Sequence, residues 1–362
     1  MIRAKVRSGW RPLLIAAALG AFFPAVRTPA APDEAPGVPP GPPPDGALAK
    51  DSAEARKPLR AGIVGCDTSH VKAFTEIFND PRAEGDIALV KVVAAFPGGS
   101  DIPASRDRVA GFTRDLREKG VKIVESIPLL LEEVDVVLLE SVDGRTHLEQ
   151  ARLILEARKP VFIDKPFAGS LADAIAIADL AAKLGVPCFS SSSLRFSPGI
   201  LGMRADEKVG QVMGCDAWGP CSLEPTHPDL FWYGVHGVEI LFTVMGTGCE
   251  RVTRVQTEGA ELVAGVWKDG RIGTFRGIRR GASGYGATVF GTKGIAPSGG
   301  YTGYKPLVEE IARFFRTGKA PVSLEETVEI FAFMEAADES KRQGGAPVAL
   351  DAVIRKARGI AK

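Results

Sequence analysis

The stretch AGIVGCDTSHVKAF, residues 61–74, decides the fold class of this chain because a β-branched strand runs through a glycine turn into an amphipathic segment. A turn that binds a dinucleotide carries three glycines, for the tight turn, for close approach of the pyrophosphate and for helix packing. Gly62 and Gly65 fit the lead-in and the first glycine. Asp67 and His70 replace the second and third. The sequence therefore predicts a strand–turn–helix unit with an altered binding turn.

The altered turn has two interpretations. In the first, Asp67, Thr68 or Ser69 caps the following helix, because these side chains accept hydrogen bonds from its free amides. In the second, Thr68 and Ser69 offer hydroxyls and amides to a phosphate, and His70 supplies a cation beside it. A carboxylate at Asp67 would face the pyrophosphate with like charge, which weakens cofactor binding unless the loop is reshaped.

The rest of the chain shows two patterns of predicted secondary structure, one after the other. Strands are expected at 59–65, 88–96, 121–126, 135–141, 160–165 and 186–192, with helices between them, including one at 104–120. This alternation predicts an α/β domain over 59–193, a Rossmann-type doubly wound parallel sheet that binds ligands at the carboxyl ends of its strands. Hairpin patterns at 260–278 and 285–294 and helices at 304–318 and 323–345 then predict an α+β domain over 194–362, with a mainly antiparallel sheet and C-terminal helices that return across the body.

The N-terminal residues have the pattern of an export signal. Four basic residues precede an apolar run that is too short to span a bilayer comfortably, so residues 1–31 are expected to be a signal peptide, with an uncleaved anchor as the alternative and no other stable membrane insertion. Residues 32–58 are rich in proline and are expected to form a linker. No Arg-Arg pair precedes the apolar run, which favours export of an unfolded chain to the periplasm or the exterior.

Composition excludes several classes of partner and site. The 45 Lys and Arg residues balance 44 Asp and Glu residues, so no field of one sign recruits nucleic acid. Five cysteines lack CxxC spacing, which argues against zinc and against a disulfide scaffold, although Cys215 and Cys221 could pair in an exported protein. His236 and Glu239 have helical spacing, but no third ligand is evident, and no metal site is predicted.

A long stretch in the first domain indicates a family. The segment VDGRTHLEQARLILEARKPVFIDKPFAGSLADA, residues 142–174, resembles the Gfo/Idh/MocA oxidoreductases, in which a histidine after a strand leads to a later strand that ends in Glu-Lys-Pro. Here the histidine is His147, and the tripeptide is Asp164-Lys165-Pro166, with Asp in place of Glu. Further pieces at 192–199, 234–246 and 335–350 follow in order, so the resemblance covers most of residues 59–350.

The resemblance implies hydride transfer, with NAD or NADP, at a CH–OH carbon of a sugar or polyol. Lys165 would reach the substrate hydroxyl and the nicotinamide, and His236 would act as general acid or base. One departure stands out: Trp232 occupies the position four residues before His236, where the family often carries an aspartate. Trp232 and Tyr233 are therefore expected to line a sugar-binding wall, and Arg195 to clamp the substrate or bridge the domains.

Other polar residues complete the predicted site. His227 or Asp229 could approach His236 from the preceding loop. Phe96 stands where an acidic residue would hold the ribose, and the next loop offers Ser100 instead. The residues expected to bind the cofactor are Gly62, Gly65, Asp67, Thr68, Ser69, His70, Ser100, Ser141, Asp143, His147, Asp164 and Lys165.

A second function remains open on the sequence. An unfolded chain exported from the cytoplasm would meet little nicotinamide cofactor afterwards. The alternative is therefore an exported carbohydrate-binding or regulatory protein that keeps the fold and carries out no hydride transfer. Formation of a homo-oligomer is left open.

Overall fold

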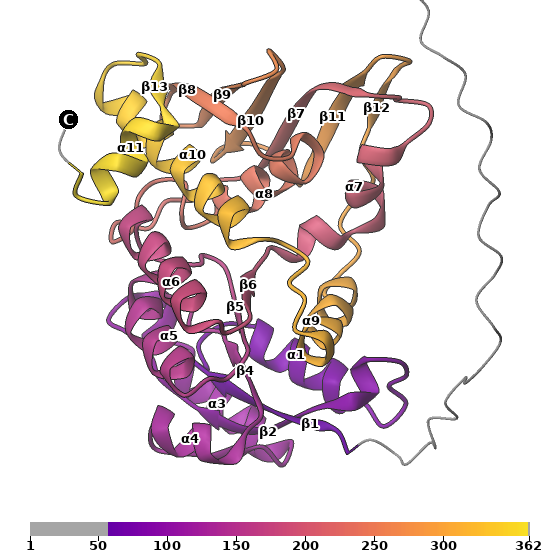
Figure 1. The fold of residues 1–362 in the computed structure, drawn as a ribbon, viewed down its shortest axis with the longest axis vertical. Helices are drawn as coiled ribbons and strands as arrows, with labels where there is room; N and C mark the ends of the chain where they lie inside the picture. The colour runs from indigo at the N-terminus through magenta and orange to yellow at the C-terminus, as the bar shows by residue number, and fades with distance from the viewer. Residues whose placement is uncertain (1–56, 361–362) are drawn as a thin grey trace, which may run out of the picture. The chain divides into compact units, whose positions relative to one another are not determined.

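A computed structural model describes residues 57–360 of the chain (Figure 1). The predicted signal peptide, 1–31, and the linker up to residue 56 lie outside the described residues. Between residues 57 and 360, none of the helices combines the length and the hydropathy needed to cross a bilayer.

The first sheet contains six strands in the order β3-β2-β1-β4-β5-β6, and every neighbouring pair is parallel. The strands are β1 (Leu59–Val64), β2 (Val90–Phe96), β3 (Lys122–Ile123), β4 (Val136–Leu139), β5 (Val161–Ile163) and β6 (Cys188–Ser190). The strand order reverses between β1 and β4, which opens a crevice at their carboxyl ends. The predicted Rossmann-type sheet is confirmed.

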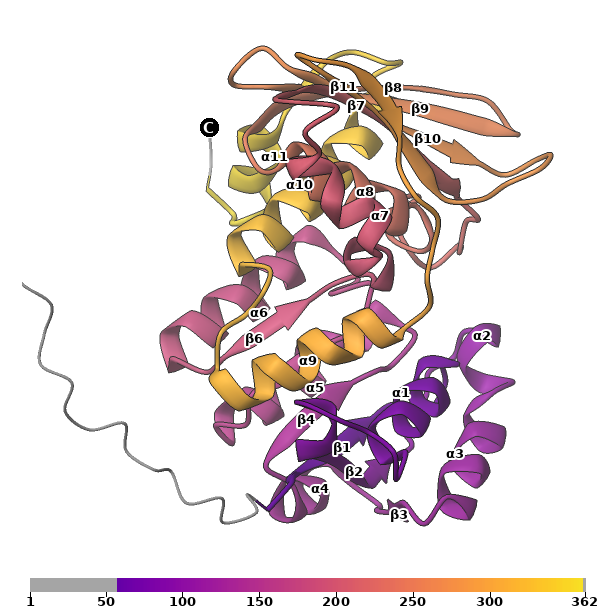
Figure 2. The same cartoon turned by 90° about the vertical axis from the view of Figure 1, so that its right-hand side faces the viewer.

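Helices cover both faces of this sheet. One face packs against α1 (His70–Asn79), α3 (Val109–Glu118) and α9 (Lys305–Thr317), and the other against α4 (Ile127–Glu133), α5 (His147–Glu156) and α6 (Leu171–Leu184). Helix α9 comes from the C-terminal part of the chain, yet it returns to the first sheet and lies beside α1 (Figures 1 and 2). Part of the segment predicted as a second domain therefore completes the core of the first.

The predicted helix at 104–120 is interrupted. The structure has α2 (Pro103–Arg106) and then α3, with a turn between them. Ser105 in α2 is fully buried and donates a hydrogen bond to Asp67. This contact ties α2 to the β1–α1 turn while α3 packs on the sheet, so one straight helix does not form.

The second sheet has seven strands in the order β12-β11-β7-β10-β9-β8-β13, and only the β7–β10 pair is parallel. Helices α8 (Gly234–Met245) and α10 (Leu324–Arg342) lie on the side that faces the first sheet (Figure 2). The strands are β7 (Val212–Pro220), β8 (Cys249–Gln256), β9 (Ala260–Trp267), β10 (Ile272–Ile278), β11 (Gly286–Gly291), β12 (Ile295–Pro297) and β13 (Val348–Ala349). The remaining helical elements are η1 (Ile87–Leu89), η2 (Gly144–Thr146), η3 (Ser193–Phe196), α7 (Pro198–Leu201), η4 (Gly202–Ala205) and α11 (Leu350–Ala357). The predicted mainly antiparallel sheet is confirmed.

The cysteines form no disulfide. All five are free and buried, so Cys215 and Cys221, which could pair in an exported protein, are not joined in this structure. Burial raises the pKa of the Cys215 thiol to about 12, because a thiolate loses its hydration in the core. These side chains pack as small apolar groups.

Gly237 in α8 allows close packing of this helix on the second sheet. A Cβ atom at this position would lie 2.1 Å from Cε2 of Phe275 in β10. We expect Gly237→Ala to lower the free energy of unfolding by about 1–3 kcal/mol, because overpacking displaces a buried ring. The control is Gly111→Ala in α3, where the new methyl group meets open space and should raise stability by about 0.5–1 kcal/mol. Urea titration of both variants measures the difference, and equal midpoints would contradict this packing.

Candidate active site

A cavity of about 180 Å³ lies at the carboxyl edge of the first sheet. Its volume is below the roughly 300–1,000 Å³ of pockets that enclose drug-sized ligands, so it encloses one part of a larger ligand and not the whole. Loops that follow β1, β4 and β5 form one wall, and the second part of the chain forms the other. The lining residues are Thr68, Ser69, His70, Arg108, Val142, Lys165, Ser193, Leu194, Trp232, Tyr233, His236, Tyr285, Tyr301 and Tyr304.

Aromatic side chains dominate the second wall. The chain has four tyrosines, and all four line this cavity together with Trp232. Burial raises the pKa of Tyr301 to about 12, so its hydroxyl keeps its proton at neutral pH. Rings of this kind pack against the apolar faces of a ligand while their hydroxyls form hydrogen bonds. The predicted placement of Trp232 and Tyr233 agrees with this wall, and the sequence reasoning missed the other three tyrosines.

Lys165 projects from the carboxyl end of β5. Its Nζ lies 5.6 Å from the centroid of the Tyr233 ring. Burial lowers the pKa of Lys165, Arg108 across the cavity lowers it further, and only the Asp164 carboxylate opposes the shift. The ammonium is therefore more readily deprotonated than that of a solvated lysine.

His236 reaches the cavity from α8, opposite the first sheet. Its Nδ1 lies 2.7 Å from Oγ of Ser192, and the Tyr285 ring meets it edge-on at 5.7 Å. Burial holds the pKa of His236 well below its usual range, and the nearby positive charges of Lys165 and His70 add to the shift. The imidazole is neutral at physiological pH.

Neither predicted loop partner reaches His236. Asp229 forms ion pairs with Arg254 (2.8 Å) and Lys341 (2.6 Å) instead. His227 lies with its Nε2 3.3 Å from Oδ1 of Asp143. Both predictions are wrong, because stronger charge partners lie nearer to each side chain.

His70 and Asp164 form a buried pair on the first wall. His70 Nδ1 lies 2.6 Å from Asp164 Oδ2, and Asp164 Oδ1 accepts a hydrogen bond from the Lys165 amide at 2.8 Å. Burial alone would raise the pKa of Asp164, but the charges and hydrogen bonds of His70 and Lys165 hold it below its ordinary value. The carboxylate therefore stays ionised and fixes the ring of His70.

Asp67 does not cap α1, and that prediction is wrong. Its fully buried carboxylate accepts hydrogen bonds from the Val142 amide at 2.9 Å and from Ser105 Oγ at 2.6 Å. Ser69 occupies the N-cap position without a side-chain hydrogen bond. Asp67 is not among the residues that line the cavity, whereas Thr68 and Ser69 are. The Asp67 carboxylate therefore does not occupy the amino end of α1. This helix end faces the cavity, where it favours an anionic group.

The two glycines at the start of the unit have different roles. Gly65 has φ +90°, and a Cβ there would lie 2.3 Å from Oγ of Ser141, so the turn requires glycine. A Cβ at Gly62 would lie 2.9 Å from Cγ1 of Val134. Gly62 therefore allows β1 to pack closely against the segment after α4. Gly65 fulfils the expected turn role, and Gly62 does not line the cavity.

Two residues after β4 stabilise the loop beside the cavity. Ser141 donates its hydroxyl proton to Gln150 Oε1. The His147 ring lies between two carbonyl oxygens, those of Ser141 (2.7 Å) and Phe167 (3.3 Å). Burial lowers the pKa of His147, and the hydrogen bonds to the two carbonyl oxygens oppose this shift. Neither side chain lines the cavity.

Asp143 is part of a charged cluster over the crevice. Arg145 binds it through two nitrogens, at 3.0 and 2.7 Å, and also pairs with Asp101 on the loop after β2. Burial opposes ionisation, but the nearby His227 ring and the hydrogen bonds from Arg145 hold the pKa of Asp143 far below its usual range. The Ser100 hydroxyl is buried nearby without a hydrogen-bond partner among residues 57–360. Asp143 and Ser100 lie outside the cavity lining.

Arg195 links three elements and does not reach the cavity. It forms buried ion pairs with Glu239 of α8 at 2.8 Å and with Glu326 of α10 at 2.7 Å. Ser323 caps α10 by accepting a hydrogen bond from the Glu326 amide at 3.1 Å, and the carboxylate of Glu326 turns to Arg195. All three residues lie in the part of the chain predicted as the second domain, so these pairs join elements of that part and neither clamp a ligand in the cavity nor bridge the two predicted domains. In the described part of the chain, no group of three His, Cys, Asp or Glu residues could hold a metal ion.

Sequence reasoning also missed two charged residues. Arg108 lines the cavity together with Thr68 and Ser69 at the amino end of α1, but its sequence context is an ordinary surface helix. Glu140 follows β4 and is fully buried with both carboxylate oxygens unpartnered. Burial, together with Asp164 and Asp67, raises the pKa of Glu140 well above its ordinary value, so it is a neutral acid. An acidic residue directly after the apolar run VVLL was the available signal.

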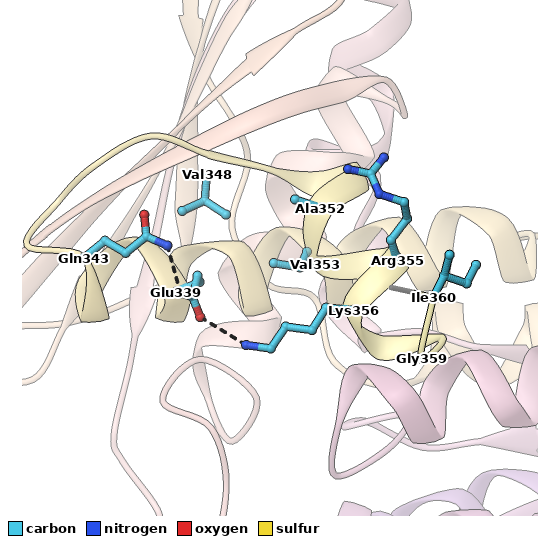
Figure 3. A pocket seen from close by; sticks show the side chains of 9 residues that line it. All are labelled: Glu339, Gln343, Val348, Ala352, Val353, Arg355, Lys356, Gly359 and Ile360. Atoms are coloured by element: carbon cyan, nitrogen blue, oxygen red, sulfur yellow. Dashed lines mark hydrogen bonds and ion pairs between the residues drawn. The ribbon is translucent and has the colours of Figure 1, made fainter. Parts of the chain in front are cut away.

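A second hollow, of about 520 Å³, lies between α10 and α11 (Figure 3). Glu339 accepts a hydrogen bond from Gln343 and lies 3.6 Å from Lys356. The lining includes no histidine, tyrosine or cysteine, and its charged groups are paired on the surface. The residues are Glu339, Gln343, Val348, Ala352, Val353, Arg355, Lys356, Gly359 and Ile360. The smaller cavity, with its convergent basic side chains, is therefore the candidate site.

Comparison with known proteins agrees with this assignment. Residues 59–192 match the model of the GFO_IDH_MocA oxidoreductase family, which is described as an NAD-binding Rossmann fold. The Rossmann domain of this chain belongs to the Gfo/Idh/MocA family. The predicted cofactor class is thereby confirmed at the level of the family. Comparison with curated protein sequences yields no match.

Solved structures share the fold over nearly their whole length. Scyllo-inositol dehydrogenase from Lactobacillus casei, with bound NAD(H) and scyllo-inositol, is 15% identical and has a TM-score of 0.67, covering 82% of this chain and 100% of that one. A probable dehydrogenase from Thermotoga maritima is 21% identical, with a TM-score of 0.63 and coverage of 81% and 100%. Myo-inositol 2-dehydrogenase from Lactobacillus plantarum is 15% identical, with a TM-score of 0.65 and coverage of 81% and 99%. At these identities the likeness shows the fold.

The charged cluster predicts a pH-dependent loss of stability in one variant. Because the native pKa of Asp143 is depressed, the charge stabilises the fold above an unfolded pKa of about 3.9, and this contribution falls as the pH drops below that value. We expect Asp143→Asn to cost about 1–3 kcal/mol at pH 7 and progressively less from pH 4 to pH 2. Asp101→Asn removes the exposed partner of the same arginine and should cost below about 1 kcal/mol. Denaturation at several pH values gives both quantities, and a cost that is constant with pH would contradict the ion pair.

Proposed function

We propose that this protein is an NAD- or NADP-dependent oxidoreductase that interconverts a hydroxyl and a carbonyl on a small sugar or polyol. The observation that carries the proposal is the cavity at the carboxyl edge of the Rossmann sheet, where Lys165 and two histidines converge on a wall that contains every tyrosine of the chain. The family match of residues 59–192 supports the cofactor class. The inositol dehydrogenases among the solved structures support the substrate class.

The residues around the cavity fit a dinucleotide. The amino end of α1, with Thr68 and Ser69, and the guanidinium of Arg108 would hold its anionic diphosphate. Asp67 does not oppose this, because its carboxylate is buried against two hydrogen-bond donors outside the lining. When bound, the nicotinamide ring supplies the hydride acceptor or donor.

Lys165 and His236 are the proposed catalytic residues that hold the reacting oxygen. They face the cavity from opposite walls, Lys165 after β5 and His236 on α8. A lysine ammonium stabilises the charge that develops on the oxygen as its proton leaves. His236, neutral and hydrogen-bonded to Ser192, would orient the hydroxyl. The aromatic side chains around them would exclude water and pack against the ring of the substrate.

Cofactor binding is the first test. The protein is purified from its native compartment and denatured, and any released nucleotide is identified by mass spectrometry; binding of added NAD⁺ and NADP⁺ to the emptied protein is then measured by calorimetry. Near-stoichiometric nucleotide, or a dissociation constant in the micromolar range, supports the oxidoreductase. Absence of binding by either cofactor would instead favour a carbohydrate-binding protein, which binding of inositols or hexoses without cofactor would then support.

Lys165→Ala separates catalysis from binding. We expect kcat/KM with scyllo-inositol, myo-inositol or a hexose to fall about 100-fold or more, because the stabilising charge is lost. The affinity for the nucleotide should change by less than about threefold, since the proposed diphosphate contacts lie elsewhere. Lys122→Ala on β3, whose side chain is 62% exposed, is the matched control and should behave like the wild type. Unchanged turnover in Lys165→Ala would remove the lysine from the mechanism.

A further inference from the structure

Two departures from the expected sequence pattern meet in the structure. His70 stands where the third glycine of the binding turn is expected, and Asp164 replaces the glutamate of the Glu-Lys-Pro tripeptide. The two residues are 94 positions apart, yet His70 Nδ1 and Asp164 Oδ2 lie 2.6 Å apart, and both side chains are at most 10% exposed. A histidine whose one nitrogen is held by a buried carboxylate has the arrangement of an oriented base.

The other nitrogen of His70 is available to a ligand. His70 lines the cavity, and among residues 57–360 no hydrogen bond engages its Nε2. The ring is fixed on its remaining sides, because Phe74 stacks on it with centroids 5.4 Å apart and Tyr304 meets it edge-on at 4.8 Å. Asp164 is itself fixed by the Lys165 amide. The ring thus has one orientation, with its free edge toward the cavity.

His236, on the opposite wall, lacks these features. Its Nδ1 contacts the Ser192 hydroxyl rather than a carboxylate, and Trp232 occupies the position one helical turn earlier. The nearest acidic residue on its own helix, Glu239, is committed to Arg195. A positive charge on His236 would be buried without a counter-ion, whereas a positive charge on His70 would face Asp164.

We propose that His70 is a further catalytic residue of the oxidoreductase, and that Asp164 is its positioning residue. This inference rests on the proposed function. In the oxidative direction the O–H bond of the substrate breaks and its proton passes to Nε2 of His70. The adjacent C–H bond breaks, and a nicotinamide ring, when bound, would accept the hydrogen together with both electrons. The lone pair left on oxygen forms the new C=O bond. In the reverse direction His70 returns the proton.

Several charged and titratable groups face His70 and enter any pH dependence. Asp164 contacts the ring directly, and Lys165 and Arg108 line the same cavity. His70 is itself the first residue of α1. The groups around the ring are Asp164 and Lys165 after β5, Arg108 before α3, Tyr233 and His236 at the start of α8, and Tyr304 before α9.

The first test uses the free protein and needs no turnover. The full chain contains four histidines, so selective ¹⁵N labelling of histidine gives a spectrum that variants can assign. At a pH where the ring is neutral, we expect His70 to carry its proton on Nδ1 and a bare nitrogen at Nε2, because Asp164 accepts the Nδ1 hydrogen bond. Asp164→Asn should shift this balance toward the other tautomer. A wild-type His70 with a protonated Nε2 and a bare Nδ1 would overturn the proposal.

The second test is kinetic. His70→Gln keeps a polar side chain of similar size, and we expect it to lower kcat/KM for alcohol oxidation about 10²- to 10⁴-fold and to abolish the acidic limb of the pH profile. Asp164→Asn should lower kcat/KM as well, because the ring loses its favoured tautomer. His70→Ala should regain part of its activity when imidazole is added, which a purely structural role does not predict.

A matched control removes packing and leaves the pair in place. Phe78→Leu truncates a fully buried ring in the same helix, α1, and should lower the melting temperature, with the acidic limb of the pH profile retained. If His70→Gln keeps wild-type kcat/KM and the wild-type pH profile, the role of His70 is refuted while the oxidoreductase stands. If the wild type binds neither NAD⁺ nor NADP⁺, the proposed function fails, and the role of His70 in hydride transfer fails with it.

Discussion

Buried charge at the carboxyl edge of the first sheet is the constraint on which the site depends. A carboxylate removed from water must find hydrogen-bond donors or a counter-ion, or else take up a proton. Asp67 finds the Val142 amide and Ser105, and Asp164 finds His70 and the Lys165 amide. Glu140 finds none and is held neutral. The three acidic residues follow β1, β4 and β5. The hydrogen bonds of Asp67 and Asp164 hold these loops together around one cavity.

Pairing of buried charges also positions the second wall of the cavity. Arg195 lies between Glu239 and Glu326, so it joins η3, which follows the last Rossmann strand, to α8 and α10. His227 lies against Asp143 on the first wall. Buried pairs of this kind add little net stability, but loss of one partner is costly, so they hold the elements in one arrangement. That arrangement sets His236 and the aromatic residues opposite Lys165.

The replaced glycines change the chemistry of the turn and leave its geometry intact. Gly65 still makes the left-handed turn, and α1 still begins beside the cavity. Asp67 is directed into a buried hydrogen-bond network, and His70 lines the cavity. A turn that normally contributes only backbone atoms thus contributes an imidazole to the wall of the site.

The sequence by itself determined the fold class, because the spacing of apolar runs and turns is a local property that each segment carries alone. It also nominated Lys165 and His236, which both line the cavity, because strand ends and family motifs can be recognised in short segments of sequence. It could not identify the partner of His70, which is 94 residues away, nor the gathering of four tyrosines from 233 to 304, nor the return of α9 to the first sheet. Those features depend on which distant segments come together, so only the tertiary structure decided them. The physical reason is that a buried charged or aromatic side chain must contact the groups that the fold brings near it, and these groups can lie far away in the sequence.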